Sequence, residues 1–356
     1  MQRFTCGTAG VSAADAARAG GKAAALGELA RAGLPVPRGF VITTAAFLLH
    51  MDGVDPDGAA RGALEALAAD DLAGIARAAA GLRARVTATG LPPEVASEIA
   101  PACAALGAGP VAVRSSATME DSAEASFAGL QDTYLAVRGT DAVLDRVRAC
   151  WASLYNDESI AYRRRQGTGE DGLAMGVVVQ RMLNPRSAGV MFTRSPVTGD
   201  RSVVAIEGTW GLGSALVGGE VTPDSFTVSK VTGEITGRRV GVKLRVHSFT
   251  PNGQGTSASP MAFPLRRTSS LTDDEARALA LIGRQVEDHY GAPQDIEWAL
   301  LGDSPGHPAL HADLADRIVL LQSRPETVWA ARDREPIASP QAKASDHVLA
   351  RFRRAL

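Results

Sequence analysis

The sequence has few of the residues that mark secreted, nucleic-acid-binding or membrane-spanning proteins. It contains three cysteines, an odd number without a CxxC pair, which excludes a disulfide framework and favours a reducing cytoplasm. Aromatic residues make up 5% and the formal charge is −2, so neither base stacking nor a basic field for nucleic acid is indicated. No apolar run approaches the roughly 20 residues of a membrane span, and no signal-peptide pattern opens the chain. We expect a cytoplasmic protein with no nucleic-acid or membrane partner.

The chain does have enough apolar sequence for a large core. Apolar residues make up 45% of 356 residues, a length that favours two or three packed units. Helical patterns dominate the first half and strand patterns the second, which predicts an α+β fold of two lobes with the binding cleft between them. We expect a helix-rich lobe at 1–172, a strand-rich lobe at 173–330 and a tail or linker at 331–356.

Three segments give sharper local predictions. Apolar residues at helical spacing predict one long amphipathic helix from Asp141 to Arg165. Thr272 followed by Glu275 three residues later predicts a helix start with a capping box. The stretch 249–270 is rich in Gly, Ser, Thr and Pro, a composition typical of a surface loop.

Two strand-like segments carry polar groups that an apolar core would not tolerate unpaired. The first, 293–299, contains Glu297, and the second, 319–325, contains Gln322 and Arg324. A carboxylate, an amide oxygen and a guanidinium together can hold Mg²⁺ and a polyphosphate, since Mg²⁺ prefers a few oxygen ligands plus substrate phosphates. The two segments, placed side by side, predict a nucleotide site; a surface salt bridge on an edge strand is the alternative.

Three further segments have residue types suited to phosphate. Gly20 and Gly21 precede Lys22 at a predicted helix start, where a helix N-terminus attracts anions. Arg114 ends a strand and is followed by hydroxyl and acidic residues, and 210–224 is rich in glycine. Each has an ordinary alternative: a surface lysine, a simple turn and a hairpin turn.

Taken together, the motifs resemble one family. They stand in the order GGKAAALGELARAGLPVPRGFVIT, VAVRSSATMED, CWASLYNDESIAYR, VVVQRM, GVMFTRSPVTGD, EGTWGLGSALVGGEVTPDSF, PQDIEWAL and LLQSRPE. This order resembles the N-terminal ATP-binding region of phosphoenolpyruvate synthase, pyruvate phosphate dikinase and rifampicin phosphotransferase, over residues 18–328. The resemblance implies an ATP-grasp-like fold. It also implies that ATP donates its β-phosphate to a histidine through a pyrophosphoryl intermediate, with AMP and phosphate as products.

The resemblance assigns the cations of the site. It places Lys22 and Arg114 on the ATP phosphates and Arg324 on the terminal phosphates, where a planar guanidinium can bind two oxygens at once. These three would be the catalytic residues, because positive charge stabilises phosphoryl transfer.

The resemblance also assigns the residues that would bind ATP and Mg²⁺. Gly129 and Thr133 fall on the nucleotide-contacting loop, and Gln180 falls near the adenine. Glu297 and Gln322 match the Mg²⁺ ligands.

The departures from the family pattern concern the acceptor. None of the six histidines stands in the Gly-rich context of the family's phosphohistidine, and the pyruvate-binding barrel is not in this sequence. Ser214 stands where many members have an acid, and Glu326–Trp329 differs from the usual ending. These features resemble free-standing ATP-binding subunits such as that of phenylphosphate synthase. The expected partner is a phosphohistidine swivelling-domain protein, which would pass the phosphate to a small acceptor bound elsewhere.

Other functions stay open at this point. The chain could be the first portion of a longer phosphoenolpyruvate synthase or antibiotic phosphotransferase, with the histidine domain downstream. It could also be a regulatory protein that binds ATP without turnover. An ordinary serine or sugar kinase is disfavoured, because no aspartate base stands in a catalytic-loop motif.

Overall fold

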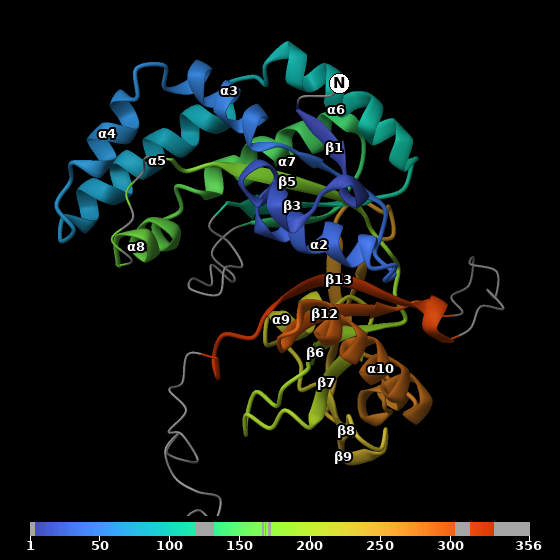
Figure 1. Ribbon diagram of the computed structural model, residues 1–356. Helices are drawn as coiled ribbons and strands as arrows, with labels where there is room; N and C mark the ends of the chain where they lie inside the picture. Colours follow the sequence, from blue (N-terminus) through green and yellow to red (C-terminus); the bar gives the residue numbers. More distant parts are fainter. Residues whose placement is uncertain are drawn as a thin grey trace, which may run out of the picture.

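The computed structural model describes residues 4–118, 132–165, 167, 169, 172–302 and 314–330. Its described strands form a five-stranded, a six-stranded and a two-stranded sheet, and every pairing is antiparallel. Figure 1 shows the five-stranded sheet with most of the helices in its upper half and the six-stranded sheet below it. This mixture of helices and antiparallel sheets confirms the α+β class.

The five-stranded sheet has the order β1-β2-β5-β3-β4. Its strands are β1 (Thr5–Gly7), β2 (Gly39–Ile42), β3 (Val111–Ala117), β4 (Thr133–Val137) and β5 (Met175–Arg181). Side chains alternate between its faces. Val177 and Val179 join the larger core, whereas Val178 and Val41 pack on the opposite face with the residues of α2 (Gly21–Arg31). Both faces are covered, so the strands read as continuous apolar runs.

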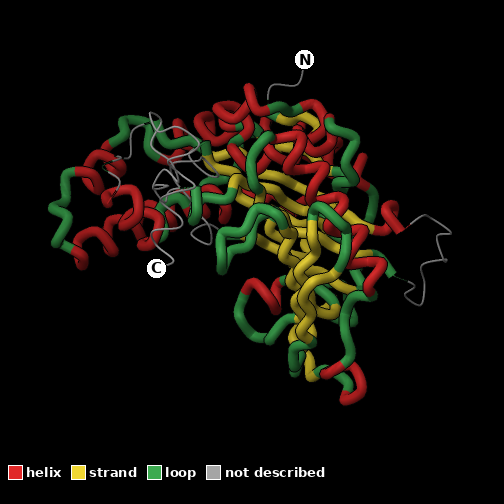
Figure 2. The backbone as a smooth tube through the Cα atoms, turned by 60° about the horizontal axis from the view of Figure 1, so that its bottom comes forward, coloured by secondary structure: helices red, strands yellow, loops and turns green. Residues whose placement is uncertain are grey.

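Helices cover the two faces of this sheet unequally. The larger core includes residues of α3 (Thr44–Val54), α5 (Leu72–Ala88), α6 (Pro93–Leu106) and α7 (Thr140–Ser153). Two short helices, α1 (Ala16–Ala19) and α4 (Ala59–Glu65), complete the series before β3, with 3-10 turns at Thr8–Gly10 and Ala13–Asp15. Figure 2 shows most of the helices at the top and left of the view, with the strands running through the middle.

The prediction of one helix from Asp141 to Arg165 is wrong, because the chain breaks after Ser153 and restarts as α8 (Asp157–Arg165). The Ser153 hydroxyl donates to the carbonyl of Cys150 at 2.7 Å, a local bond that competes with helix continuation. Arg163 then turns back and donates to the carbonyl of Leu154 at 2.6 Å. Periodicity alone did not show this turn, because the buried residues keep helical spacing on both sides of it.

The six-stranded sheet has the order β13-β12-β6-β7-β8-β9. Its strands are β6 (Ser187–Phe192), β7 (Val203–Trp210), β8 (Asp224–Ser229), β9 (Ile235–Arg239), β12 (Gln294–Leu300) and β13 (Ile318–Pro325). One face packs on α10 (Asp273–Tyr290), whose Leu279 and Val286 join Trp298 in a second core. The predicted helix start is confirmed: Glu275 N donates to Thr272 Oγ1 at 3.2 Å and Thr272 N to Glu275 Oε2 at 2.8 Å.

The stretch 249–270 is more ordered than its composition predicted. Thr256–Pro260 forms β11, which pairs with β10 (Arg245–Phe249), and a 3-10 turn follows at Phe263–Arg267. The expectation of a loop is wrong, because pairing with β10 gives the backbone N–H and C=O groups of this polar segment hydrogen-bond partners. A strand can therefore form here without an apolar core. The helix α9 (Ser214–Val217) packs against this hairpin.

The division between the two large sheets falls after β5, because that strand pairs with β2 and β3. Met175 thus belongs to the first sheet, although it lies beyond residue 172; the predicted lobe limits stay a prediction. Helix α2 lies beside β13 where the two sheets meet (Figure 1). The predicted tail at 331–356 lies outside the described residues. Within the described part of the chain, no helix is long and apolar enough to cross a membrane.

Candidate functional site

A cavity of about 330 Å³ lies between the five-stranded and six-stranded sheets. Most of its lining is apolar, with a few polar groups, as is typical of a site for an organic ligand. Both large sheets and the segment after β7 contribute to it. Its lining includes Ala112, Arg114, Thr133, Leu135, Gln180, Met182, Leu183, Ala188, Gly189, Leu212, Gly213, Ser214, Val217, Glu297, Trp298 and Leu321.

Three of the predicted site residues reach this cavity from one face of the five-stranded sheet. Arg114 on β3 is paired with Thr133 on β4, and Gln180 on β5 is paired with Ala112, two residues before Arg114. Because alternate residues share a face, Arg114, Thr133 and Gln180 all point the same way. The Gln180 amide nitrogen is buried and has no hydrogen-bond partner among the described residues. This side of the cavity therefore presents an amide donor for a ligand.

Arg114 joins the two sheets through its guanidinium group. It donates to the carbonyl of Leu321 at 2.8 Å, to Glu297 Oε2 at 3.1 Å and to Gln322 Oε1 at 2.6 Å. Its Nε is buried without a partner within the described part of the chain. Three predicted site residues, far apart in the sequence, thus meet at one point.

Glu297 and Gln322 face each other across β12 and β13, in the side-by-side arrangement that the sequence predicted. The register shifts just after Glu297, a bulge that re-aims nearby side chains. Both side-chain oxygens approach the same Arg114 nitrogen, so they are close enough together to contact one cation. A carboxylate and an amide oxygen suit Mg²⁺, and the described residues contain no group of three or more His, Cys, Asp or Glu side chains placed to hold a metal.

Lys22 lies next to this cluster but does not line the cavity. Its Nζ donates to the carbonyl of Ser115 at 2.7 Å, and the side chain is buried. The start of α2 packs tightly on β3: Ala23 N donates to Ser116 Oγ at 3.0 Å, and Gly20, at φ 83°, leaves no room for a Cβ beside the Ser116 carbonyl. One amide of the helix N-terminus is thus already used by the protein.

Arg324 pairs with Asp295, a residue that the sequence reasoning did not select. The two are cross-strand partners, and Arg324 Nη2 lies 3.5 Å from Asp295 Oδ2. Burial raises the pKa of Asp295 to about 6, with Arg324 opposing this rise and Glu326 adding to it. The signal was present in the spacing, because Asp295 is two residues before Glu297 and strand residues two apart share a face. Gly129 lies outside the described residues.

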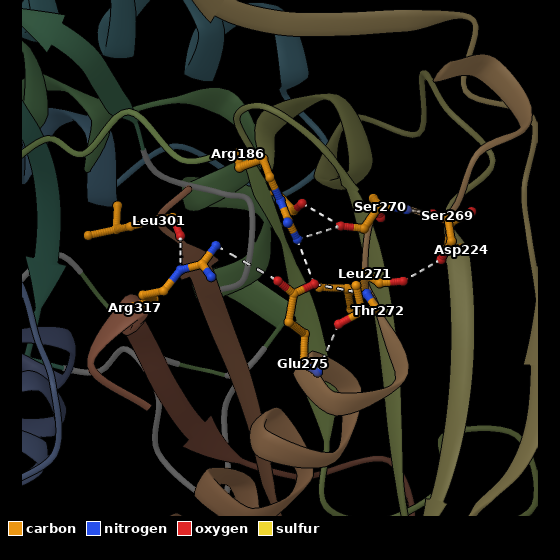
Figure 3. Close-up of polar contacts among 10 residues, drawn as sticks. Arg186, Asp224, Ser269, Ser270, Leu271, Thr272, Glu275, Leu301 and Arg317 are labelled. Atoms are coloured by element: carbon orange, nitrogen blue, oxygen red, sulfur yellow. Dashed lines mark hydrogen bonds and ion pairs between the residues drawn. The ribbon is translucent and has the colours of Figure 1, made fainter. Parts of the chain in front are cut away.

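A buried polar network fixes β6, whose Ala188 and Gly189 line the cavity. Figure 3 shows Arg186 and Ser270 drawn together with Glu275 at the start of α10. Arg186 donates to Glu275 Oε2 at 2.6 Å, and Ser187 Oγ donates to the Ser270 carbonyl at 2.6 Å. The Ser270 amide in turn donates to Asp224 Oδ2 at 2.7 Å. Helix α10 and strand β8 therefore hold the strand that forms the cavity wall.

The chain matches one family model over nearly its whole length. The model describes the AMP/ATP-binding domain of pyruvate phosphate dikinase and covers residues 16–345. This match includes every predicted site residue.

Curated relatives of this chain are longer proteins. It is 46% identical over 296 residues to a rifampicin phosphotransferase from a Streptomyces species, covering 82% of this chain and 34% of the relative. It is 42% identical over 320 residues to a probable phosphoenolpyruvate synthase of Methanothermobacter thermautotrophicus, covering 88% of this chain and 44% of the relative. It is 37% identical over 351 residues to the phosphoenolpyruvate synthase of Aeropyrum pernix, covering 90% of this chain and 42% of the relative. The chain thus spans less than half the length of each of these relatives.

Proposed function

Because the chain belongs to the family of the pyruvate phosphate dikinase AMP/ATP-binding domain, we propose that it binds Mg-ATP in the cavity between its sheets. We propose further that the β-phosphate passes to a histidine on another domain or subunit. The histidine nitrogen attacks the β-phosphorus and AMP leaves. Water then splits the resulting pyrophosphoryl-histidine, so that inorganic phosphate departs and one phosphoryl group stays on the histidine.

The observation that carries this proposal is the convergence of Arg114, Glu297 and Gln322 at one edge of the cavity. A cation beside a carboxylate and an amide oxygen is the composition that holds a polyphosphate and its metal ion. The apolar remainder, with the free Gln180 amide, suits a base. In this assignment Thr133 and Gly129 contact the nucleotide, and the two sheets with their helices form the lobes of an ATP-grasp-like fold.

Three cations would bind the phosphate chain in this proposal. Arg114 and Lys22 would contact ATP phosphates, and Arg324 the terminal phosphates. Their positive charge would offset the charge that develops during transfer. Glu297 and Gln322 would hold Mg²⁺, whose chemistry is to neutralise phosphate charge when it is bound.

The acceptor belongs to a second polypeptide region in this proposal. The relatives extend well beyond the matched part, and none of the histidines of this chain stands in the family's Gly-rich context. We propose that a phosphohistidine swivelling domain, on a separate subunit or downstream of residues 331–356, receives the phosphate and carries it to a small acceptor. Pyruvate, a phenol or an antibiotic hydroxyl would serve.

The fate of labelled ATP tests this function. ATP labelled at the β- or the γ-phosphate is incubated with the chain alone and with a histidine-domain protein of the same family. We expect AMP to form, the γ-label to appear as phosphate and the β-label to appear on the partner's histidine. Formation of ADP would indicate an ordinary kinase. Tight ATP binding without transfer to the partner would indicate the regulatory alternative.

A further inference from the structure

The segment after β7 forms one wall of the cavity. It contains a serine whose hydroxyl makes a hydrogen bond with a histidine. Gly213, Ser214 and Val217 line the cavity. Ser214 Oγ lies 2.8 Å from Nδ1 of His247 on β10. The His247 carbonyl accepts from Leu212 N at 2.9 Å, so the same residue anchors the backbone and the side chain of this wall.

The second nitrogen of His247 lies beside a carboxylate. Nε2 is 3.3 Å from Glu220 Oε2, and Glu220 also accepts from Arg245 Nη1 at 3.2 Å. Arg245 first, and the neighbouring His247 ring second, hold the pKa of Glu220 below its usual value. At neutral pH Glu220 is therefore an anion. His247 Nε2 has no well-aligned hydrogen bond among the described residues, so the negative charge of Glu220, 3.3 Å away, is what favours a hydrogen on that nitrogen.

Few other charges surround the ring. Strand β10 packs against β11, α9 and β7. β11 and α9 carry no titratable side chain, and His247 is paired with Ala258 on β11. β7 carries one carboxylate, Glu207, four residues before Gly211, which bridges to His247. Glu220 is thus the charged group that lies against the ring nitrogen.

The protonation of His247 decides what Ser214 offers to the cavity. When a neutral ring carries its hydrogen on Nε2, beside the anionic Glu220, only a lone pair remains at Nδ1, so the Ser214 hydroxyl must donate to it. A protonated ring donates from Nδ1 instead, and the Ser214 hydrogen is free to point into the cavity. The neutral form makes Ser214 an acceptor toward a ligand, and the charged form makes it a donor.

We propose that Ser214 donates a hydrogen bond to a phosphate oxygen of the nucleotide, and that His247 is a positioning residue whose protonation makes this donation possible. The inference rests on the proposed nucleotide site. It follows that phosphate binding and proton uptake at His247 are coupled, each favouring the other to the same degree. ATP binding therefore favours the protonated ring, and the protonated ring binds ATP more tightly, so the gain in affinity is lost as the solution becomes more alkaline.

Calorimetry in buffers of different ionisation heat counts the protons taken up when Mg-ATP binds. We expect the wild type to take up more protons near pH 7.5 than His247→Asn, whose amide can contact Ser214 but does not titrate. Protonation of the nucleotide itself cancels in this difference. Adenosine, which lacks phosphate, should show no such difference. Ser214→Ala should lose the extra uptake, and Ser214→Thr, which keeps the hydroxyl, should restore it.

A second histidine provides the matched control. His289 on α10 also has its Nε2 near a carboxylate, at 3.5 Å from Glu28 Oε2, but it does not line the cavity. His289→Asn should leave the proton uptake at the wild-type value. The ring-nitrogen shifts of His247 followed by NMR at one fixed pH should show more of the protonated ring when Mg-ATP is added to the unaltered protein.

Two results would overturn the inference while leaving the proposed function intact. One is ATP binding with the same proton uptake in wild type and His247→Asn and unchanged ring-nitrogen shifts of His247. The other is wild-type uptake in Ser214→Ala, or equal coupling with adenosine. Absence of any ATP binding by the wild type would overturn the nucleotide site itself, and the inference with it.

Discussion

Two polar clusters each contain a residue of the six-stranded sheet, and they differ in how completely their hydrogen-bonding groups have partners. In the first, Asp224 and Lys243 are both fully buried and 2.5 Å apart, and Asp224 also accepts from the amides of Gly241 and Ser270. In the second, Arg114 meets Glu297 at the cavity, where the Glu297 side chain is 37% exposed and Arg114 Nε has no partner among the described residues.

The difference separates a structural role from a binding role. The Asp224 cluster is closed, because both carboxylate oxygens accept from protein donors. The Arg114 cluster is open, because it has unused hydrogen-bonding capacity facing a cavity of ligand size. A buried charge without its partner is costly, so the first cluster should govern stability and the second should govern ligand affinity.

The largest effect is expected from breaking the closed cluster. Lys243→Met keeps most of the side-chain volume but leaves the Asp224 carboxylate buried without its cation. We expect the free energy of unfolding to fall by about 3–5 kcal/mol, measured by urea denaturation. Removing the charge of Asp224 as well, in the double variant with Asp224→Asn, should recover part of this loss.

An exposed ion pair serves as the control for that experiment. Arg277 and Asp274 lie on the surface of α10, with side chains 48% and 84% exposed. Arg277→Ala should change the free energy of unfolding by less than about 1 kcal/mol. If Lys243→Met were equally mild, the closed cluster would not be the structural element that its burial indicates.

The open cluster should respond in the opposite way. Arg114→Ala removes a cation that would bind phosphate, and charge-assisted hydrogen bonds contribute about 1.5–3 kcal/mol, so ATP affinity should fall by about tenfold to a hundredfold. The loss of unfolding free energy should be smaller than for Lys243→Met. Titration calorimetry with Mg-ATP and urea denaturation measure the two quantities on one sample.

Arg83 is a matched arginine away from the cavity. It too donates to a carbonyl and a carboxylate, those of Tyr155 and Asp157. Arg83→Ala should weaken folding slightly and leave ATP affinity at the wild-type value. Equal losses of affinity in the two variants would mean that Arg114 acts through the fold, and the contrast between open and closed clusters would not hold.

The sequence predicted the open cluster better than the closed one. Glu297 and Gln322 stood out because polar residues interrupted apolar strands, and the structure places them face to face. Lys243 gave no such signal, because it stands between Val242 and Leu244 in a segment where charged and apolar residues alternate. Its burial depends on Asp224, nineteen residues earlier. Local pattern identifies a charge in an apolar run. Only the tertiary fold shows that a charge in an alternating segment is buried.

The same limit applies to the elements. The start of α10 followed from Thr272 and Glu275, because a capping box is a contact within four residues. The break after Ser153 and the pairing of β11 with β10 did not follow, because each depends on contacts that periodicity does not report. His247 was passed over among the histidines for this reason: its neighbours Ser214 and Glu220 come from other segments.

The smallest effect that we expect is a pH dependence of the unfolding free energy. It comes from Glu275, which belongs to the buried network around Ser270 and Asp224. Burial by itself raises the pKa of Glu275, but hydrogen bonds from Arg186 and Thr272 more than offset it, so the pKa is lowered overall. A lowered carboxyl pKa contributes stability that is present above the unfolded-state pKa and is lost as pH falls through the folded-state pKa. Glu275→Gln cannot titrate, so the stability difference between wild type and this variant, measured by urea denaturation from pH 7 to pH 3, should shrink as the solution becomes more acidic. A difference that stayed constant over this range would show that the Arg186 contact acts through packing and not through the charge of Glu275.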